Sequence, residues 1–470
     1  MSNKLLQIAR HEGLALARDG RFRWACAVVF VLLGLSLALG AQQYRERERE
    51  RAVAAEISRQ QWEAQPSRNP HGAAHFGIYV LRPFQPTSLL EPGLQRFLGE
   101  AAFLEAHRQN PTRYRPVEDA TAVARMAELT TAAILQHFLP LLIFLFAFTA
   151  FASERERGTL RMLASSGVAP STLAIGKALG VAAALALLLI PAILLGSAVL
   201  GLAAAGSAGL GRFLGMLTGF LVFYGGLIGL ALAISAWSRS SRVALLAVLG
   251  FWVANGFLVP VLVSDLAERL YPVMSTQDFL DQLDADLAKG FDGHNLQSPE
   301  ALELTQRTLE EYGVNTVEAL PINIAGVAFL ESEQQSQTIV DRHFGELAEI
   351  YQRQDRLTRI AALVAPFLAV RSWSMGLAGT DIFHHLHFVA ASEDYRRDFN
   401  RRLNEDLRDG GPSGQSYSAP EEFWAELPQF NYSPPITRQV LSQNQWHFAV
   451  LSLWSICAIT AAIVAAHRLT

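Results

Sequence analysis

The sequence predicts an all-α membrane protein with six transmembrane helices, both termini in the cytoplasm, and two extracytoplasmic, mainly helical insertions. Three observations lead to this fold class. The chain of 470 residues is 51% hydrophobic and only 17% charged, which is typical of membrane proteins. Its apolar residues gather in six nearly uncharged runs, and its Lys and Arg residues gather beside three particular ends of those runs.

Each apolar run is long enough to cross a bilayer, which takes about 20 residues in a helix. The expected spans are 24–41, 131–152, 173–205, 213–237, 243–263 and 446–466. Trp24, Trp237 and Trp446 lie at span ends, where an indole ring prefers the headgroup level. The two long polar stretches between spans, 42–130 and 264–445, are the expected insertions.

The orientation follows from basic residues in the short flanks, since positive charge favours the cytoplasmic side. Such residues occur before the first span, between spans two and three, and between spans four and five: Lys4, Arg10, Arg18, Arg21, Arg23, Arg155, Arg157, Arg161, Lys177, Arg239 and Arg242. These flanks are therefore predicted to be cytoplasmic. Six spans then place both termini inside and both insertions outside, in a multi-pass protein of the bacterial inner membrane.

Residues 1–23 are expected to form an amphipathic helix along the cytoplasmic membrane surface. The first span follows this basic region and ends in Ala-Leu-Gly-Ala at 38–41, as a signal peptide would. We favour an uncleaved anchor, because a basic region of more than twenty residues is long for a signal. The charged run Arg-Glu-Arg-Glu-Arg-Glu-Arg at 45–51 is predicted to continue the first helix into water.

The second insertion shows helical patterning, clearest over 332–364, and few alternating strand-like runs. The apolar stretch at 360–370 is too short for a span and is predicted to be a core or interfacial helix. A mainly helical domain is therefore expected between spans five and six.

The most specific local feature is the loop ASERERGTLRMLASSGVAPSTLAIGKALG at 152–180. It resembles the cytoplasmic loop of ABC type-2 transporter permeases, which reads roughly E-x-E-x-G-T-L-x-x-L before a Gly-Lys that opens the next helix. The matching positions here are Glu154, Glu156, Gly158, Thr159, Leu160 and Leu163, followed by Pro170, Gly176 and Lys177. The resemblance extends to six spans and an N-terminal surface helix, in a bacterial subfamily with a large insertion before the last span.

The resemblance implies that 153–172 holds a coupling helix that docks on an ATPase. Its expected docking residues are Glu154, Arg155, Glu156, Arg157, Gly158, Thr159, Leu160 and Leu163. The charges would set the register at the rim of a groove, and Leu160, Met162 and Leu163 would fill it. The alternative is an ordinary charged turn between two spans.

The implied function is that of a permease subunit that couples ATP hydrolysis by a separate ATPase to translocation, in the direction of export. The implied partners are an ABC ATPase dimer, a second permease copy or paralogue, and membrane lipid. ATP and Mg²⁺ would bind the ATPase, with no cofactor in this chain, which is not expected to be an enzyme by itself. The Gly176–Lys177 pair is not part of a phosphate-binding loop, because the glycine five residues earlier and the Ser or Thr immediately after the lysine are both missing. A net charge of −4 does not suggest a nucleic-acid partner.

Two other functions remain open. The chain would be a mechanical transmitter if ATP hydrolysis moved the insertions against a periplasmic partner without solute transport. It would be a membrane enzyme if its histidines were catalytic, although HExxH and GxSxG are absent from the sequence.

Two histidine groups bear on metal binding: His71 with His75, spaced i,i+4, and His384, His385 and His387. No cysteine flanks either group, so we expect structural or surface roles and no metal site. Gln136, His137 and Asn255 lie inside spans, where polar groups mark a pathway or form hydrogen bonds between helices.

Overall fold

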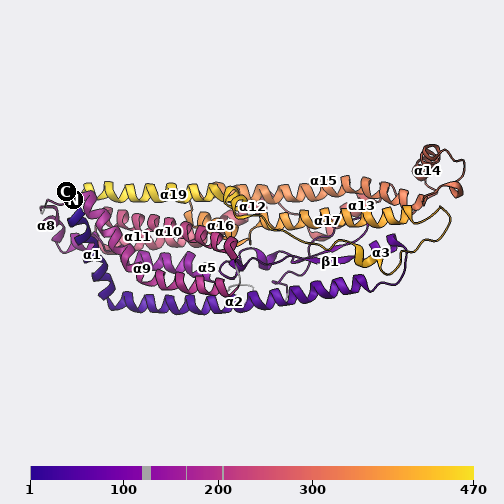
Figure 1. Cartoon of the computed structure of the whole chain (residues 1–470). Helices are drawn as coiled ribbons and strands as arrows, with labels where there is room; N and C mark the ends of the chain where they lie inside the picture. The colour runs from indigo at the N-terminus through magenta and orange to yellow at the C-terminus, as the bar shows by residue number, and fades with distance from the viewer. Residues whose placement is uncertain (1, 119–128, 166, 204–205, 470) are drawn as a thin grey trace.

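The computed structural model describes residues 2–118, 129–165, 167–203 and 206–469. The molecule is elongated (Figure 1), with a helical bundle at one end and a second folded region at the other. Both ends of the chain lie at the outer tip of the bundle. We call the second region, residues 45–118, 271–365 and 379–436, the distal domain.

Within the described residues, six helices are long and apolar enough to cross a membrane, which is the number expected. They are α2 (Gly20–Glu63), the helical segment Thr131–Glu156, α9 (Pro170–Leu202), α10 (Gly206–Trp237), the helical segment Ser241–Leu270 and α19 (Thr437–His467). A separate helix, α1 (Ser2–Arg18), precedes them.

Two of the six contain a π-helical turn. The second comprises α5 (Thr131–Ala133), η3 (Ile134–Phe138), α6 (Leu139–Ala147) and α7 (Ala152–Glu156), and the fifth comprises α11 (Ser241–Val253), η4 (Ala254–Leu258) and α12 (Val259–Leu270). Both π turns, η3 and η4, come just before a proline, Pro140 or Pro260. Proline has no N–H to donate and clashes with the carbonyl four residues earlier, so a wider turn relieves the strain.

Helix α10 is the most deeply buried span and packs along α19. A Cβ at Gly229 would lie 2.8 Å from the backbone nitrogen of Ile459, and one at Gly226 would lie 2.8 Å from Ser455 Oγ. The Ser455 hydroxyl donates to the Val222 carbonyl at 2.6 Å. Small residues and a hydroxyl therefore bring these two helices together, as is common inside membranes.

Helix α2 runs without a break from the bundle into the distal domain (Figure 1). Its charged half is stabilised by ion pairs one turn apart, such as Arg51–Glu48 at 2.9 Å and Arg59–Glu63 at 2.8 Å. Near its end, the Trp62 indole donates to the Trp424 carbonyl at 3.1 Å. The prediction that the first helix continues through the 45–51 charge run is confirmed.

The first insertion is less helical than expected. After α2 it contains α3 (Pro70–Phe76), β1 (Ile78–Leu81), η1 (Pro86–Leu89), η2 (Gln95–Phe97) and β2 (Ala101–Leu104). The strands pair antiparallel, with Ile78 opposite Leu104. Prolines at 83, 86 and 92 prevent a long helix here, whereas the Ile-Tyr-Val-Leu of β1 favours a strand.

The second insertion is mainly helical, as predicted. It contains α13 (Thr276–Leu287), α14 (Pro299–Tyr312), η5 (Val317–Ala319), α15 (Ile324–Ala361), α16 (Pro366–Ala378), α17 (Ile382–Asp409) and α18 (Phe423–Glu426). The two insertions share one core, in which Trp62 packs on Phe399 and Trp424, and Val80 packs with Phe388. Apart from α16, they therefore form a single domain.

Helix α16 belongs to the bundle and not to the distal domain. The Trp373 indole donates to the Gly215 carbonyl of α10 at 2.9 Å, and Asn444 of α19 lies against Gly376. Ten of its thirteen residues are buried. The apolar stretch 360–370, predicted to be a core or interfacial helix, is divided: it contains the end of α15, a turn at 362–365 and the start of α16, and only the α16 part lies in a buried core helix.

Candidate functional site

The end of the second span and the loop that follows it fold as two short helices, α7 and α8 (Thr159–Ser165), which we call the α7–α8 loop. Gly158 separates them with a φ of 75°, a left-handed conformation that glycine adopts without strain. No atom lies within 4 Å of the place where its Cβ would be, so the glycine is required for backbone shape alone. The loop lies at the end of the bundle that carries both chain termini (Figure 1).

Lys177, near the start of α9, connects this loop to the N-terminal helix. Its ammonium group lies 2.7 Å from Glu154 of α7 and 3.2 Å from Glu12 of α1, and its side chain is only 3% exposed. The ammonium also lies 5.5 Å from the centre of the Phe151 ring. One buried cation therefore holds three helices, α1, α7 and α9, at a single point.

Arg155 and Glu156 attach the loop to two further helix ends. The Arg155 guanidinium donates to the carbonyls of Ala236, at 2.6 Å, and Ser238, at the C-terminus of α10. The Glu156 carboxylate accepts from the backbone N–H and the hydroxyl of Ser241, both at 2.8 Å, at the N-terminus of α11. Each charge is opposite in sign to the partial charge of the helix end it meets.

The remaining predicted site residues divide between surface and core. Arg157, Gly158 and Thr159 are exposed, while Leu160 is buried in the core of this chain. The position of the Leu163 side chain lies outside the described part of the structure. Met162 is 71% exposed and is the large apolar side chain that this loop presents to solvent among its described residues.

Ser235 is a contributor that the sequence analysis missed. Its buried hydroxyl donates to the Phe148 carbonyl at 2.6 Å and accepts from the backbone N–H groups of Phe151 and Ala152, at 3.0 and 3.1 Å. These bonds fix the break between α6 and α7 against α10. A serine in an apolar span is too common a feature for sequence patterning to have identified this role.

The N-terminal helix packs closely on α9 through glycines. A Cβ at Gly176 would lie 2.8 Å from Ile8, and one at Gly180 would lie 2.5 Å from the Glu12 side chain and 2.8 Å from the Ala9 carbonyl. The Gly-Lys pair at 176–177 thus has two uses: the glycine admits α1, and the lysine binds it.

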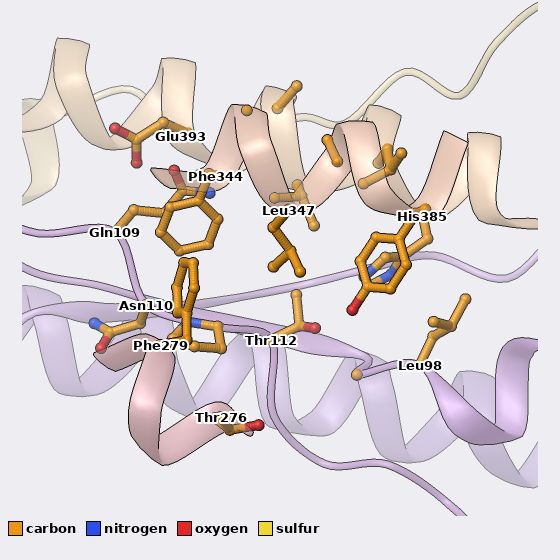
Figure 2. A pocket seen from close by; sticks show the side chains of 18 of the residues that line it. Leu98, Gln109, Asn110, Thr112, Thr276, Phe279, Phe344, Leu347, His385 and Glu393 are labelled. Carbon is orange, nitrogen blue, oxygen red and sulfur yellow. The ribbon is translucent and has the colours of Figure 1, made fainter. Parts of the chain in front are cut away.

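A cavity of about 640 Å³ lies in the distal domain between the two insertions (Figure 2). Leu98, Gln109, Asn110 and Thr112 from the first insertion face α13, α15 and α17 from the second. Apolar rings and polar amides alternate around it. The aromatic part includes Phe279, which packs edge-on against Phe344 at 5.1 Å.

Charged groups line one side of this cavity. Glu393 accepts from Arg396 at 2.8 Å and from Arg397 at 2.7 Å, and Arg397 also pairs with Asp341. His385 lies on another part of the wall, and burial lowers its pKa to about 3, so its ring is neutral at physiological pH. Arg115 also lines the cavity, so the wall combines charged, neutral polar and apolar side chains.

The polar span residues lie where the bundle meets the distal domain. Gln136 donates at 2.7 Å to Glu91, which also accepts from the Ser374 hydroxyl at 2.8 Å. Burial raises the pKa of the Glu91 carboxyl. The His137 carbonyl accepts from the Trp252 indole at 3.0 Å, so η3 faces the fifth span near η4, which contains Asn255.

The histidines fall into separate places. His384 bonds Asp381 at 2.6 Å, His387 bonds Tyr432 at 3.0 Å, and His385 lines the cavity. His71 and His75, on α3, converge with two histidines that the sequence analysis did not consider, His107 and His294. Sequence spacing does not identify the four histidines as one group, because they come from three separate segments of the chain.

The sequence profile described as ABC-2 family transporter protein matches residues 6–285, more than half of the chain. The chain belongs to the ABC-2 transporter family. It is accordingly a multi-pass membrane protein of the permease type, which agrees with its six apolar helices. Residues 277–433 match a second profile, described as Domain of unknown function (DUF3526). No curated protein sequence matches the chain.

Proposed function

We propose that this ABC-2 permease is driven by a separate ABC ATPase that docks on the α7–α8 loop, in the cytoplasm of a bacterium, and that it exports a substrate. The observation that carries the proposal is the attachment of this loop to three helices directly, α9, α10 and α11, and to α1 through Lys177. Glu154, Arg155 and Glu156 each bond a different element of the bundle. A force applied at α8 would therefore reach α1, α9, α10 and α11 together.

The docking roles are divided differently from the expectation based on sequence. Three of the four charged residues bond other helices of this chain, so among the described side chains of the loop we assign the surface offered to the ATPase to Arg157, Thr159 and Met162. An exposed methionine and an exposed arginine on the same loop suit a groove with an apolar floor and an acidic rim. A dimer of permeases with a dimer of ATPases would place two such loops side by side.

Transport across the membrane is supported by the distal cavity, whose mixed polar and apolar lining suits an amphiphilic ligand. Mechanical transmission to a periplasmic partner is the second candidate function, and the continuity of α2 favours it. A helix of 44 residues connects the bundle to the distal domain without a hinge. Movement of α2 in the membrane would thus move the distal domain as well.

The docking proposal is tested by a pair of substitutions in the reconstituted complex. Met162→Asp should leave thermal stability unchanged, because the side chain is exposed, but should lower permease-dependent ATPase activity about tenfold. Leu160→Asp should instead destabilise the permease by about 3 kcal/mol, because it buries an unpaired charge. Normal ATPase activity with Met162→Asp would contradict docking at this loop.

A further inference from the structure

Four histidine rings in the distal domain surround a common point. His71 and His75 lie on α3, His107 follows β2, and His294 lies between α13 and α14. One ring nitrogen from each lies within 4.8 Å of the others. The ring centres are separated by 4.9 to 5.5 Å for every pair. Four points at nearly equal separations form a tetrahedron.

The closest nitrogens match the spacing of metal ligands. The Nε2 atom of His71 lies 3.2 Å from those of His107 and His294, and the Nε2 atoms of His75 and His294 lie 3.4 Å apart. Nitrogens bound to Zn²⁺ at about 2.0–2.1 Å in a tetrahedron would lie about 3.3–3.4 Å from one another.

In three of the four rings the other nitrogen lies near an oxygen that can accept its proton. His294 Nδ1 lies 3.1 Å from the Asp292 carboxylate, His107 Nδ1 lies 3.4 Å from the Glu333 carboxylate, and His71 Nδ1 lies 2.9 Å from Asn404 Oδ1. A proton on Nδ1 of these three rings leaves the lone pair of each Nε2 directed to the centre. This is the usual arrangement around metal-bound histidine.

Ordinary hydrogen bonds between the histidines do not account for this arrangement. With their protons on Nδ1, His71, His107 and His294 have no proton to share at Nε2. Only His75 has one to offer, so at most one of the three close contacts is a hydrogen bond. The other two place lone pair against lone pair, which is unfavourable unless a cation lies between them.

The surroundings of the cluster also suit a bound cation. The His71 ring stacks on Phe329 with 3.4 Å between ring centres, which closes the inner side. His107 holds a left-handed backbone conformation, with φ of 67°, and such conformations cluster at functional sites.

We propose that His71, His75, His107 and His294 bind one Zn²⁺ ion through their Nε2 atoms. Imidazole suits Zn²⁺ among the common metals, and four protein ligands in a tetrahedron make a closed site with a structural role. The ion would join the two insertions, because His294 belongs to the second and the other three ligands belong to the first. It would also anchor the loop between α13 and α14, which leads to the far tip of the molecule (Figure 1).

The test uses the full-length protein in detergent, stripped with a chelator and then titrated with Zn²⁺. Wild type should bind one equivalent, and its melting temperature should rise. The double variant His75→Gln/His294→Gln should weaken Zn²⁺ binding at least 100-fold, because two of the four ligands are removed. Both side chains are exposed, so their replacement should not disturb the fold. Its melting temperature without metal should equal that of stripped wild type, which shows that it folds.

His387→Gln is the matched control, because His387 lies in the same domain but outside the four-histidine cluster. Its ring forms a hydrogen bond with Tyr432. It should bind Zn²⁺ like wild type. Co²⁺ in place of Zn²⁺ should give wild type the intense visible absorption of a tetrahedral site, and the double variant should lack it. Equal binding by wild type and the double variant, or no retention of Zn²⁺ by wild type, would overturn the proposal.

Discussion

Lys177 shows how one side chain organises the cytoplasmic end proposed for this permease. A lysine with 3% of its side chain exposed is costly to bury unless its charge is paired. Glu12 of α1 and Glu154 of α7 supply two carboxylates. In the Gly-Lys pair, the glycine therefore allows α1 to pack closely and the lysine pairs with the two carboxylates. This explains the position of the pair at the start of a span.

Replacing Lys177 with Met should destabilise the protein by about 2 kcal/mol, because two carboxylates lose their shared cation. The cost is moderated because Glu12 and Glu154 are 18% and 22% exposed and reach water. Thermal unfolding in detergent measures the change. Lys289→Met is the control: this lysine is 75% exposed in its pair with Asp286, so its loss should leave the melting temperature nearly unchanged.

Sequence reasoning expected the four charged residues of the loop, at positions 154–157, to face a partner ATPase. Glu154, Arg155 and Glu156 bond this chain itself. The charge pattern of the sequence does not distinguish a charged residue that binds a partner protein from one that caps a neighbouring helix, because both lie near the surface. Only the approach of the ends of α10 and α11 decides between them.

At the scale of the elements, the contact between α1 and α9 depends on the absence of side chains. Gly180 faces the Ala9 carbonyl and the Glu12 side chain, and Gly13 faces the Gly180 carbonyl at 3.1 Å from its ideal Cβ. The amphipathic helix predicted from the sequence thus lies against a span through backbone contact. Its Ile8 and Leu16 pack against the bundle core, while Leu6 and Leu14 remain exposed.

Gly180→Ala should separate α1 from α9, because the added Cβ would lie 2.5 Å from Glu12 and 2.8 Å from a carbonyl that cannot rotate away. A loss of about 1–3 kcal/mol is expected. Gly201→Ala in the same helix is the matched control, since nothing lies within 4 Å of its Cβ position. If both variants unfold at the same temperature, the close contact of α1 with α9 is not needed.

At the scale of the whole molecule, the two insertions act as one domain at the opposite end from the chain termini (Figure 1). Deleting the whole second insertion would also remove α16, which packs on α10 and α19 of the bundle. A deletion meant to test the distal domain must therefore keep α16, or it will damage the bundle.

The orientation is tested with single cysteines at Ser165 and Ser416, two exposed serines at opposite ends, after replacement of Cys26 and Cys457. In intact cells an impermeant thiol reagent should label position 416 and spare position 165, because the basic flanks favour the cytoplasm. Permeabilised cells supply the control, in which both positions should react. Labelling of position 165 in sealed cells would show that the orientation is the opposite of the predicted one.

The sequence by itself determined the six spans, the continued first helix, the helical second insertion and the family, because apolar runs of fixed length and local motifs are read along the chain. Tertiary structure alone decided which side chains meet across long separations. His71 and His294 are 223 residues apart, yet their nitrogens lie 3.2 Å apart. The merged insertions, the bonds of Arg155 and Glu156 to other helices, and the histidine cluster all depend on such contacts, which local patterning does not encode.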